Sequence, residues 1–280
     1  MNVLEFSAWV LTGSFAAGLL GSLTGLGGGV VLVPLLTLIF HVDIHYAIGA
    51  SLVSVIATSS GAASAYVKEG YSNIRVGMFL EIATSIGALI GAALATHIHA
   101  TTIAIIFGLV LLYSAADSFR EHGSDAASPV TKPDPLAAKL HLDSTYPGPS
   151  GPTQYHVQAV PAGFGIMLGA GALSGLLGIG SGAMKVLAMD RAMHLPFKVS
   201  TTTSNFMIGV TAAASAGIYF SRGYIDPGLS MPVMLGVLAG SLLGTKILMR
   251  ARVQTLRIMF ALVIFVLAVE MIYNGWTGKI

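Results

Sequence analysis

Long apolar stretches separated by short polar connections dominate the pattern of residues along the chain. Five lie in the first half, at 4–23, 29–40, 47–67, 76–96 and 101–119. Five more lie in the second half, at 160–177, 182–193, 200–220, 229–248 and 256–273. Most have about the 20 residues with which a helix crosses the hydrocarbon core of a bilayer. The pattern predicts an all-α polytopic membrane protein.

The second stretch of each half is too short for a full crossing. Its 12 residues rise about 18 Å as a helix, whereas the hydrocarbon core is about 30 Å thick. Each follows a glycine-rich break, Gly25-Leu-Gly-Gly-Gly29 or Gly178-Ile-Gly-Ser-Gly182. We expect two discontinuous short helices, each reached by non-helical backbone that is buried in protein or lines a cavity.

The second half repeats the first. A shift of 153 residues aligns them without a gap and matches glycine, histidine, hydroxyl and aromatic positions. The matched pairs include Gly18 with Gly171, Gly87 with Gly240, His41 with His194, Ser51 with Ser204, Thr58 with Thr211, and Tyr66 with Tyr219. This constant register predicts a duplication, with transmembrane repeat 1 at 1–119 and repeat 2 at 159–280. Residues 120–158 form a polar, Pro- and Gly-rich linker in which we expect little helix.

Lysine and arginine are distributed unevenly between the predicted loops. With five crossings per half, eleven lie on one face, in loops 68–75, 120–158, 191–198 and 246–257, and two on the other. Four crossings per half would divide them seven to six. Because basic residues concentrate in cytoplasmic loops, we expect ten crossings, a cytoplasmic linker and both termini outside. An odd number of crossings per half makes the two repeats inverted in topology.

The composition supports a membrane protein and argues against other classes. Hydrophobic residues make up 54% of the chain and charged residues only 9%, against roughly 25% charged in soluble domains. The net charge of +2 gives no reason to expect a nucleic-acid partner, and the absence of cysteine excludes disulfides and thiol chemistry. The first apolar stretch has Glu5 where a signal peptide would be basic, so we expect a retained first helix.

The two glycine breaks are the main candidates for a binding site. Converging N-termini of short helices offer unpaired N–H groups and the positive ends of two helix dipoles, which attract anions. The candidate residues are Gly27, Gly28, Gly29, Gly180, Ser181 and Gly182. The alternative is that these glycines serve only close helix packing.

Lys185 adds a positive charge three positions after Gly182, where repeat 1 has Leu32. A lysine at the centre of a membrane helix costs roughly 2.5–3.5 kcal/mol even on lenient scales. It can bind an anionic substrate, compensate Asp190 or another acid, or extend to the membrane interface.

Hydroxyl and acidic residues complete the candidate chemistry. Ser51, Ser204 and Asn205 can donate hydrogen bonds to an oxyanion, although small polar residues also bond neighbouring helices. Glu81, Asp117 and Glu270 are candidates for ion coupling, with solvated helix ends as the alternative reading. We expect no metal site, no cofactor and no enzymatic nucleophile, since no motif for any of them is present.

The doubled motif resembles the TauE/SafE family of sulfite exporters and anion permeases, also called TSUP. The matching stretches are Gly18-Leu-Leu-Gly-Ser-Leu-Thr-Gly-Leu-Gly-Gly-Gly29 with Pro34 following, Gly175-Leu-Leu-Gly-Ile-Gly-Ser-Gly182, Ala47-Ile-Gly-Ala-Ser51 and Ser200-Thr-Thr-Thr-Ser204. The likeness covers nearly the whole chain except the linker. It implies a transporter of the bacterial cytoplasmic membrane for sulfite or sulfonates such as sulfoacetate. The family pattern does not include Lys185, so the role of that residue is a physical inference.

We therefore expect a secondary transporter that moves a small organosulfur anion by alternating access, one repeat rocking against the other, with a proton or cation coupled to it. A passive anion channel is the first alternative and an intramembrane enzyme the second. Direction of transport, coupling ion and oligomeric state do not follow from the sequence.

Overall fold

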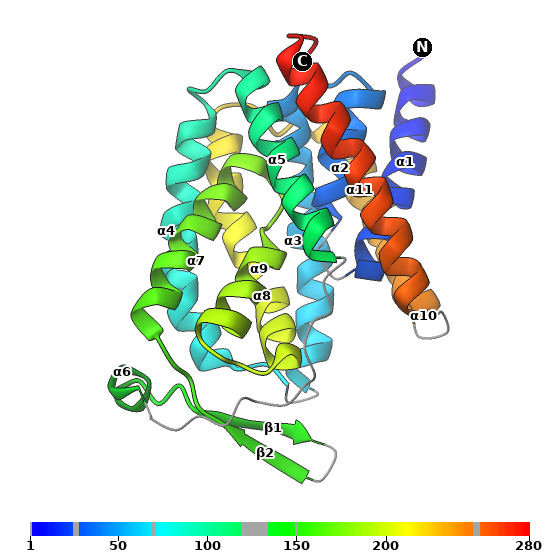
Figure 1. Ribbon diagram of the computed structural model, residues 1–280. Coiled ribbons are helices and arrows are strands. Elements are labelled where there is room, and N and C mark those ends of the chain that lie inside the picture. The colour runs from blue at the N-terminus through cyan, green and yellow to red at the C-terminus, as the bar shows by residue number, and fades with distance from the viewer. Residues whose placement is uncertain (1, 25–27, 69–70, 119–133, 149–150, 249–252) are drawn as a thin grey trace.

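The computed structural model is a helical bundle with a small extension at one end (Figure 1). It describes residues 2–24, 28–68, 71–118, 134–148, 151–248 and 253–280. The long helices of the first half are α1 (Val3–Thr24), α3 (Ile44–Lys68), α4 (Ile74–Ala95) and α5 (Ala100–Ser118). Those of the second half are α7 (Val160–Leu177), α9 (Phe197–Ser221), α10 (Pro227–Leu248) and α11 (Val253–Trp276).

The two short helices are present where the sequence predicts them. The first is α2 (Gly29–Pro34), which continues without interruption into a wider π-helical turn, η1 (Leu35–Ile39). The second is α8 (Gly182–Leu187), which continues into η2 (Ala188–Ala192). Both are followed closely by a histidine with positive φ, His41 at 52° and His194 at 58°. The two half-helices therefore end alike, each in a π-helical turn and a histidine with positive φ.

The duplication is also present in the close contacts between helices. A methyl group on Gly18 would collide with the backbone of Val237, and one on Gly171 with the backbone of Thr84. The shift of 153 residues that relates Gly18 to Gly171 also relates Thr84 to Val237. The helix pairs α1–α10 and α4–α7 are thus the same contact made twice, and each pair joins one repeat to the other.

Corresponding helices run in opposite directions. In Figure 1, α5 runs downward and its counterpart α11 runs upward beside it. Both termini lie at the upper end, and the extension formed by the linker lies at the lower end. The structure thus has the inverted arrangement and the common end for both termini that the sequence predicts.

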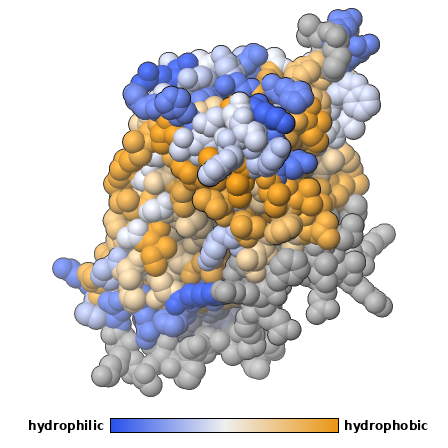
Figure 2. Space-filling view, turned by 45° about the horizontal axis from the view of Figure 1, so that its top comes forward, coloured by the Kyte–Doolittle hydropathy of each residue, from blue (hydrophilic) through white to orange (hydrophobic). Residues whose placement is uncertain are grey.

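The bundle has the surface of a membrane protein. By length and composition, four described helices can cross a bilayer, with candidate spans Leu4–Gly21, Ile74–Ala95, Val160–Leu177 and Pro227–Gly244. Large apolar side chains of α4, including Ile82, Ile86 and Leu94, are exposed. Figure 2 shows an apolar belt below a more hydrophilic upper end. Such a belt matches the hydrocarbon region of a bilayer.

The helices associate as two bundles that do not coincide with the two repeats. We call α1, α2–η1, α3 and α10 the first bundle, and α7, α8–η2, α9 and α4 the second bundle, because the helices of each pack on one another. The second bundle has its own apolar core, which includes Leu80, Met167 and Met207. The bundles meet mainly where α3 packs on α9, with α5 paired to α11 alongside. Each bundle takes helices from both halves, so the contacts within each bundle join one repeat to the other.

The linker contains more structure than the sequence predicts. It forms a short helix, α6 (Pro135–Lys139), and an antiparallel hairpin of β1 (Ser144–Gly148) and β2 (Gly151–Tyr155). Asp134 begins α6 because its side chain accepts a hydrogen bond from the Leu136 amide at 2.8 Å, the usual function of an N-cap aspartate. Its second oxygen accepts from the Val160 amide at 3.1 Å, and this bond lowers the pKa of the Asp134 carboxyl.

Asn73 connects this hairpin to the helical bundle through hydrogen bonds. Its side-chain oxygen caps α4 by accepting from the Val76 amide at 3.1 Å. Its side-chain nitrogen donates to the Leu142 carbonyl at 2.9 Å and to the Tyr155 hydroxyl at 2.7 Å. Burial raises the pKa of Tyr155 to about 12. One amide group therefore joins α4, the linker and the hairpin.

We expect Asn73→Ala to lower the free energy of unfolding by about 2 kcal/mol, since it removes a helix cap and the hydrogen bonds donated to the Leu142 carbonyl and the Tyr155 hydroxyl. Asn73→Ser is the matched control, because serine keeps a capping oxygen and loses the two donated bonds. Denaturant unfolding in detergent should rank the wild type first, Asn73→Ser second and Asn73→Ala last. Equal stability of all three would mean that the hairpin is not held through Asn73.

Candidate functional site

The two glycine breaks lie against each other where the bundles meet. A methyl group on Gly29, at the start of α2, would come within 3.0 Å of the Gly178 carbonyl oxygen and within 3.3 Å of the Ile179 Cα. The Ser51 hydroxyl of α3 donates to the Gly178 carbonyl at 2.8 Å. The structure thus brings together Gly29, Ser51 and the second break. Gly27 lies outside the described residues, and Gly28 is a buried residue with helical φ and ψ.

The second break has an unusual backbone. Gly178 and Gly180 have φ of +68° and +69°, and Ser181 has φ of +44°. For a residue other than glycine, the left-handed conformation costs roughly 1–2 kcal/mol. The Ser181 hydroxyl is buried and has no hydrogen-bond partner among the described residues. The break therefore holds a strained residue with an unpaired hydroxyl directly before α8.

The serines of α3 and α9 hold the breaks in place. Ser204 donates from its hydroxyl to the Gly182 carbonyl at 3.2 Å, much as Ser51 donates to Gly178. Both serines are buried, whereas Asn205 is half-buried. In this conformation the two hydroxyl protons bond to backbone carbonyls, the helix-linking use that was the alternative reading of the sequence.

Lys185 is joined to an acid through a hydroxyl group. Its ammonium donates to the Thr211 hydroxyl of α9 at 2.6 Å, and Thr211 donates to Glu81 Oε1 of α4 at 2.7 Å. Ser85 donates to the same carboxylate oxygen at 3.0 Å. Lys185 is 0% exposed and Glu81 is 7% exposed. A positive and a negative charge are thus buried together inside the second bundle.

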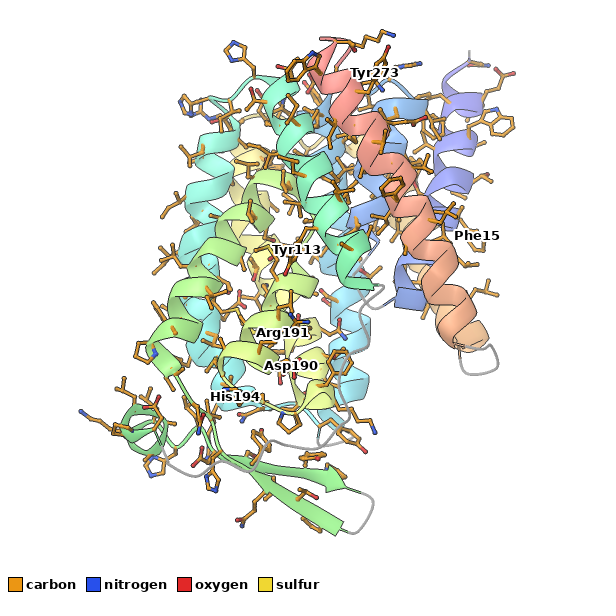
Figure 3. All side chains as sticks on the ribbon, in the orientation of Figure 1. Phe15, Tyr113, Asp190, Arg191, His194 and Tyr273 are labelled. Atoms are coloured by element: carbon orange, nitrogen blue, oxygen red, sulfur yellow. The ribbon has the colours of Figure 1, made fainter. Side chains whose placement is uncertain are left out.

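This arrangement excludes one alternative reading for Lys185 and one for Glu81. Lys185 is not extended to an interface, and it is linked to Glu81 through Thr211. Glu81 is not a solvated helix-end residue, because α4 begins at Ile74 and the Glu81 side chain faces α9 in its third turn. Asp190 and Arg191 lie on η2, nearer the lower end (Figure 3).

The other acids differ from Glu81. Glu270 is exposed on α11, three residues before Tyr273, which Figure 3 shows near the upper end. The Asp117 side chain lies outside the described part of the structure. Of the three coupling candidates, Glu81 is the one that the structure links to Lys185.

The charged group occurs in one of two symmetry-related places. The shift that relates the repeats places Leu32 at Lys185, Met234 at Glu81 and Thr58 at Thr211. The hydroxyl is kept while both charges are absent from the first bundle. Lys185 and Glu81 therefore occur together in the second bundle, and the corresponding site of the first bundle contains neither charge.

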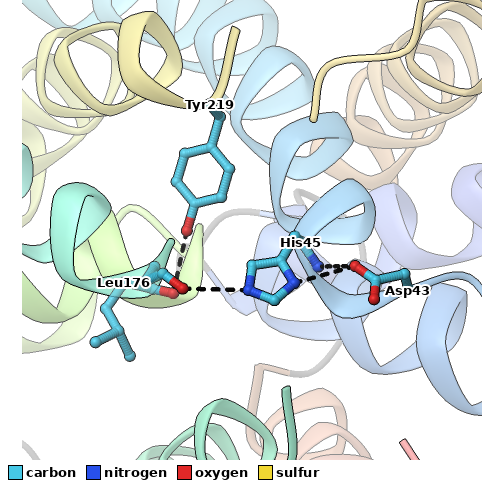
Figure 4. Close-up of polar contacts among 5 residues, drawn as sticks. Asp43, His45, Leu176 and Tyr219 are labelled. Atoms are coloured by element: carbon cyan, nitrogen blue, oxygen red, sulfur yellow. Dashed lines mark hydrogen bonds and ion pairs between the residues drawn. The ribbon is translucent and has the colours of Figure 1, made fainter. Parts of the chain in front are cut away.

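Aromatic and charged residues pack at the upper end of α3 and α9. Tyr219 donates to the carbonyls of Gly175 at 3.1 Å and Leu176 at 3.4 Å, just before the second break. Figure 4 shows this bond beside the His45–Asp43 pair, in which Nδ1 of His45 lies 3.1 Å from the carboxylate. The hydrogen bond with His45 lowers the pKa of Asp43. Tyr224 stacks on His45 with ring centres 5.0 Å apart.

Comparison with known proteins supplies the family. The profile of the sulfite exporter TauE/SafE family matches residues 10–271. The chain belongs to this family. This TauE/SafE protein is 28% identical over 267 residues to the probable membrane transporter protein YunE of Bacillus subtilis strain 168, covering 92% of this chain and 94% of YunE.

Two further relatives carry the same description. The probable membrane transporter protein YdhB of Bacillus subtilis strain 168 is 27% identical and covers 83% of this chain and 86% of its own. The probable membrane transporter protein MJ0441 of Methanocaldococcus jannaschii is 25% identical and covers 92% of both chains. No solved structure matches. The family and these relatives indicate a membrane transport protein.

Thr211 is the site residue that sequence reasoning missed. The sequence shows it only as the counterpart of Thr58 in the repeat. Its seven-residue spacing from Ser204 was the available signal, because that spacing continues the face of α9 that packs on α8.

Proposed function

We propose that this protein is a secondary transporter for a small organosulfur anion, sulfite or a sulfonate such as sulfoacetate, and that Lys185 supplies the charge that binds it. The observation that carries the proposal is a fully buried ammonium one helical turn after an unpaired, buried Ser181 hydroxyl. Residues four apart share a helix face. A sulfonate needs this combination of positive charge and hydrogen-bond donors.

In the proposed site, Lys185 and Ser181 contact the anion, and the N–H groups at the starts of α2 and α8 add hydrogen bonds. Gly28, Gly29, Gly180 and Gly182 allow the anion to approach the backbone closely. Ser51 and Ser204 fix the two breaks, and Asn205 offers a further donor when the bundles move. Gly27 directly precedes Gly28 in the sequence and completes the proposed set.

The closed state of the site supports alternating access. Because Lys185 is 0% exposed, an anion can reach it only after a rearrangement. We propose that the first and second bundles rock against each other along the contact of α3 with α9. We prefer this motion to a rocking of repeat against repeat, because the α1–α10 and α4–α7 pairs join the repeats. The proposed site combines α2 of one repeat with α8 of the other, and inverted repeats commonly place the site at the repeat interface.

The membrane setting belongs to the same proposal. The chain lies in the bacterial cytoplasmic membrane, with repeats at 1–119 and 159–280, the linker at 120–158 in the cytoplasm and both termini outside. The eleven-to-two distribution of basic residues supports this orientation.

Uptake into proteoliposomes tests the proposal. Labelled sulfite, sulfoacetate, methanesulfonate, taurine, acetate and chloride are compared at constant ionic strength, with thermal stabilisation of the purified protein as a parallel measure of binding. Saturable flux of an organosulfur anion, with selective stabilisation, is the expected result. Flux that never saturates would favour a channel, conversion of the compound without flux would favour an enzyme, and no response to any anion would contradict the proposal.

A further inference from the structure

We propose that the site binds one proton together with each anion, and that the Glu81 carboxylate carries this proton. The inference rests on the proposed function, because it describes what happens when an anion reaches Lys185. It identifies the coupled ion as a proton and the Glu81 carboxylate as the group that carries it.

The first observation is that Glu81 has a free oxygen in a closed place. Oε1 accepts from Thr211 and Ser85, whereas Oε2 is buried and has no hydrogen-bond partner among the described residues. An ionised carboxylate that is buried with one oxygen unpaired is poorly solvated. The free oxygen is a position at which a proton can be held.

The second observation is that Thr211 has two acceptors for one proton. Its hydroxyl lies 2.7 Å from Glu81 Oε1 and 3.0 Å from the Met207 carbonyl oxygen. While Glu81 is ionised, the hydroxyl donates to the carboxylate. Once Glu81 is protonated, the hydroxyl can donate to the Met207 carbonyl instead, and its lone pairs still accept from Lys185. Thr211 therefore stays bonded in both protonation states.

The third observation is the charge surrounding Glu81. Lys185 on α8 is the charged group that the described contacts link to it. The contacts from its own helix and from α9 are the neutral hydroxyls of Thr84, Ser85 and Thr211. Helix α7 contains no Asp, Glu, His, Lys or Arg, and the only such residue in α9 is Lys198, at its second position. Glu81 therefore depends on Lys185 for its counter-charge.

The charge balance then gives the coupling. In the empty site, the Glu81 carboxylate and the Lys185 ammonium neutralise each other. A monovalent anion at Lys185 takes over that positive charge and leaves Glu81 as a second, uncompensated negative charge in the membrane interior, which is strongly unfavourable. Binding one proton on Glu81 restores neutrality. Anion and proton thus bind together and cross together, and a monovalent sulfonate such as methanesulfonate moves without net charge.

The symmetry-related place supports this account. Met234 and Leu32 stand where Glu81 and Lys185 would be, so the first bundle has neither the anion charge nor the proton group. A proton acceptor occurs only where the anion-binding charge occurs. The two charges form one functional unit.

The test measures methanesulfonate binding by titration calorimetry at a series of pH values. This anion keeps its single charge across neutral pH, whereas sulfite titrates and would obscure the result. Above the pH at which Glu81 ionises, wild-type affinity should fall about tenfold per pH unit, because binding is linked to the uptake of one proton. Glu81→Gln, which imitates the protonated acid, should bind with an affinity that does not depend on pH as long as Lys185 keeps its proton. Glu270→Gln is the matched control and should keep the wild-type slope.

Proton uptake by the unaltered chain provides a second measurement that needs no variant. Adding methanesulfonate to weakly buffered protein should remove about one proton from solution per anion bound, once Glu81 is ionised. Wild-type binding that is tight but independent of pH, or a slope that persists in Glu81→Gln, would overturn the proton proposal and leave the anion site standing. Failure of the wild type to bind any sulfonate or sulfite would overturn both.

Discussion

Lys185→Met should reduce the affinity for a transported anion by at least about tenfold, and about a hundredfold if the ammonium makes the strong charge-assisted bonds proposed here. Methionine is an unbranched side chain that can fill much of the lysine volume. The substitution also leaves Glu81 without its counter-charge, so we expect lower stability, since breaking one member of a buried charge pair is strongly destabilising. The initial rate of anion uptake and the unfolding midpoint measure the two effects separately.

The double variant Lys185→Met with Glu81→Gln separates binding from folding. Removing both charges should restore stability, because a neutral pair carries no desolvation penalty. If Lys185 binds the anion, uptake stays lost in the stable double variant. If Lys185 only neutralises Glu81, uptake returns with stability, and that outcome would exclude Lys185 from the site. Lys198→Met, which removes an exposed lysine near the start of α9, is the control for nonspecific loss of positive charge.

Local features of the sequence were sufficient to predict most of the fold. The short helices were predictable because glycine clusters interrupt the apolar pattern at the same place in each half, and α2 and α8 begin at the predicted Gly29 and Gly182. The inverted topology was predictable because lysine and arginine concentrate in the loops on one side of the membrane. The small structures in the linker were not, although Asp134 before Pro135 is a recognisable helix start. A strand pair as short as β1 and β2 leaves too weak a pattern in a Pro- and Gly-rich segment.

The hydrogen-bonded series Lys185–Thr211–Glu81 was harder to predict for a physical reason. A membrane helix can be apolar on every side, so its sequence does not show which face turns inward. Glu81 was visible as an acid in an apolar helix, but its direction toward Thr211 depends on how α4 packs on α7 and α9. The division into two bundles is likewise a property of packing, since each bundle combines helices that are distant in the chain.

The packing of α4 on α7 provides a second prediction with a large effect. Gly171→Ala should lower the free energy of unfolding by about 2 kcal/mol or more, because the new methyl group meets the backbone of Thr84 and the helices must separate. Gly169→Ala, two residues away on the same helix, places its methyl group in open space. That variant should be unchanged or more stable by up to about 1 kcal/mol, since alanine favours a helix over glycine. Unfolding midpoints in detergent measure both.

The symmetry of the fold makes this prediction stricter. Gly18 meets Val237 as Gly171 meets Thr84, so Gly18→Ala should destabilise the protein to a similar degree. The two variants should nevertheless differ in function, because only α4 carries Glu81. Moving α4 away from α7 shifts Glu81 relative to Thr211, so Gly171→Ala should lose more uptake than Gly18→Ala at equal stability. Equal stability of Gly171→Ala and Gly169→Ala would contradict the close approach of α4 and α7. Equal loss of uptake in Gly171→Ala and Gly18→Ala would contradict a special dependence of uptake on the position of Glu81.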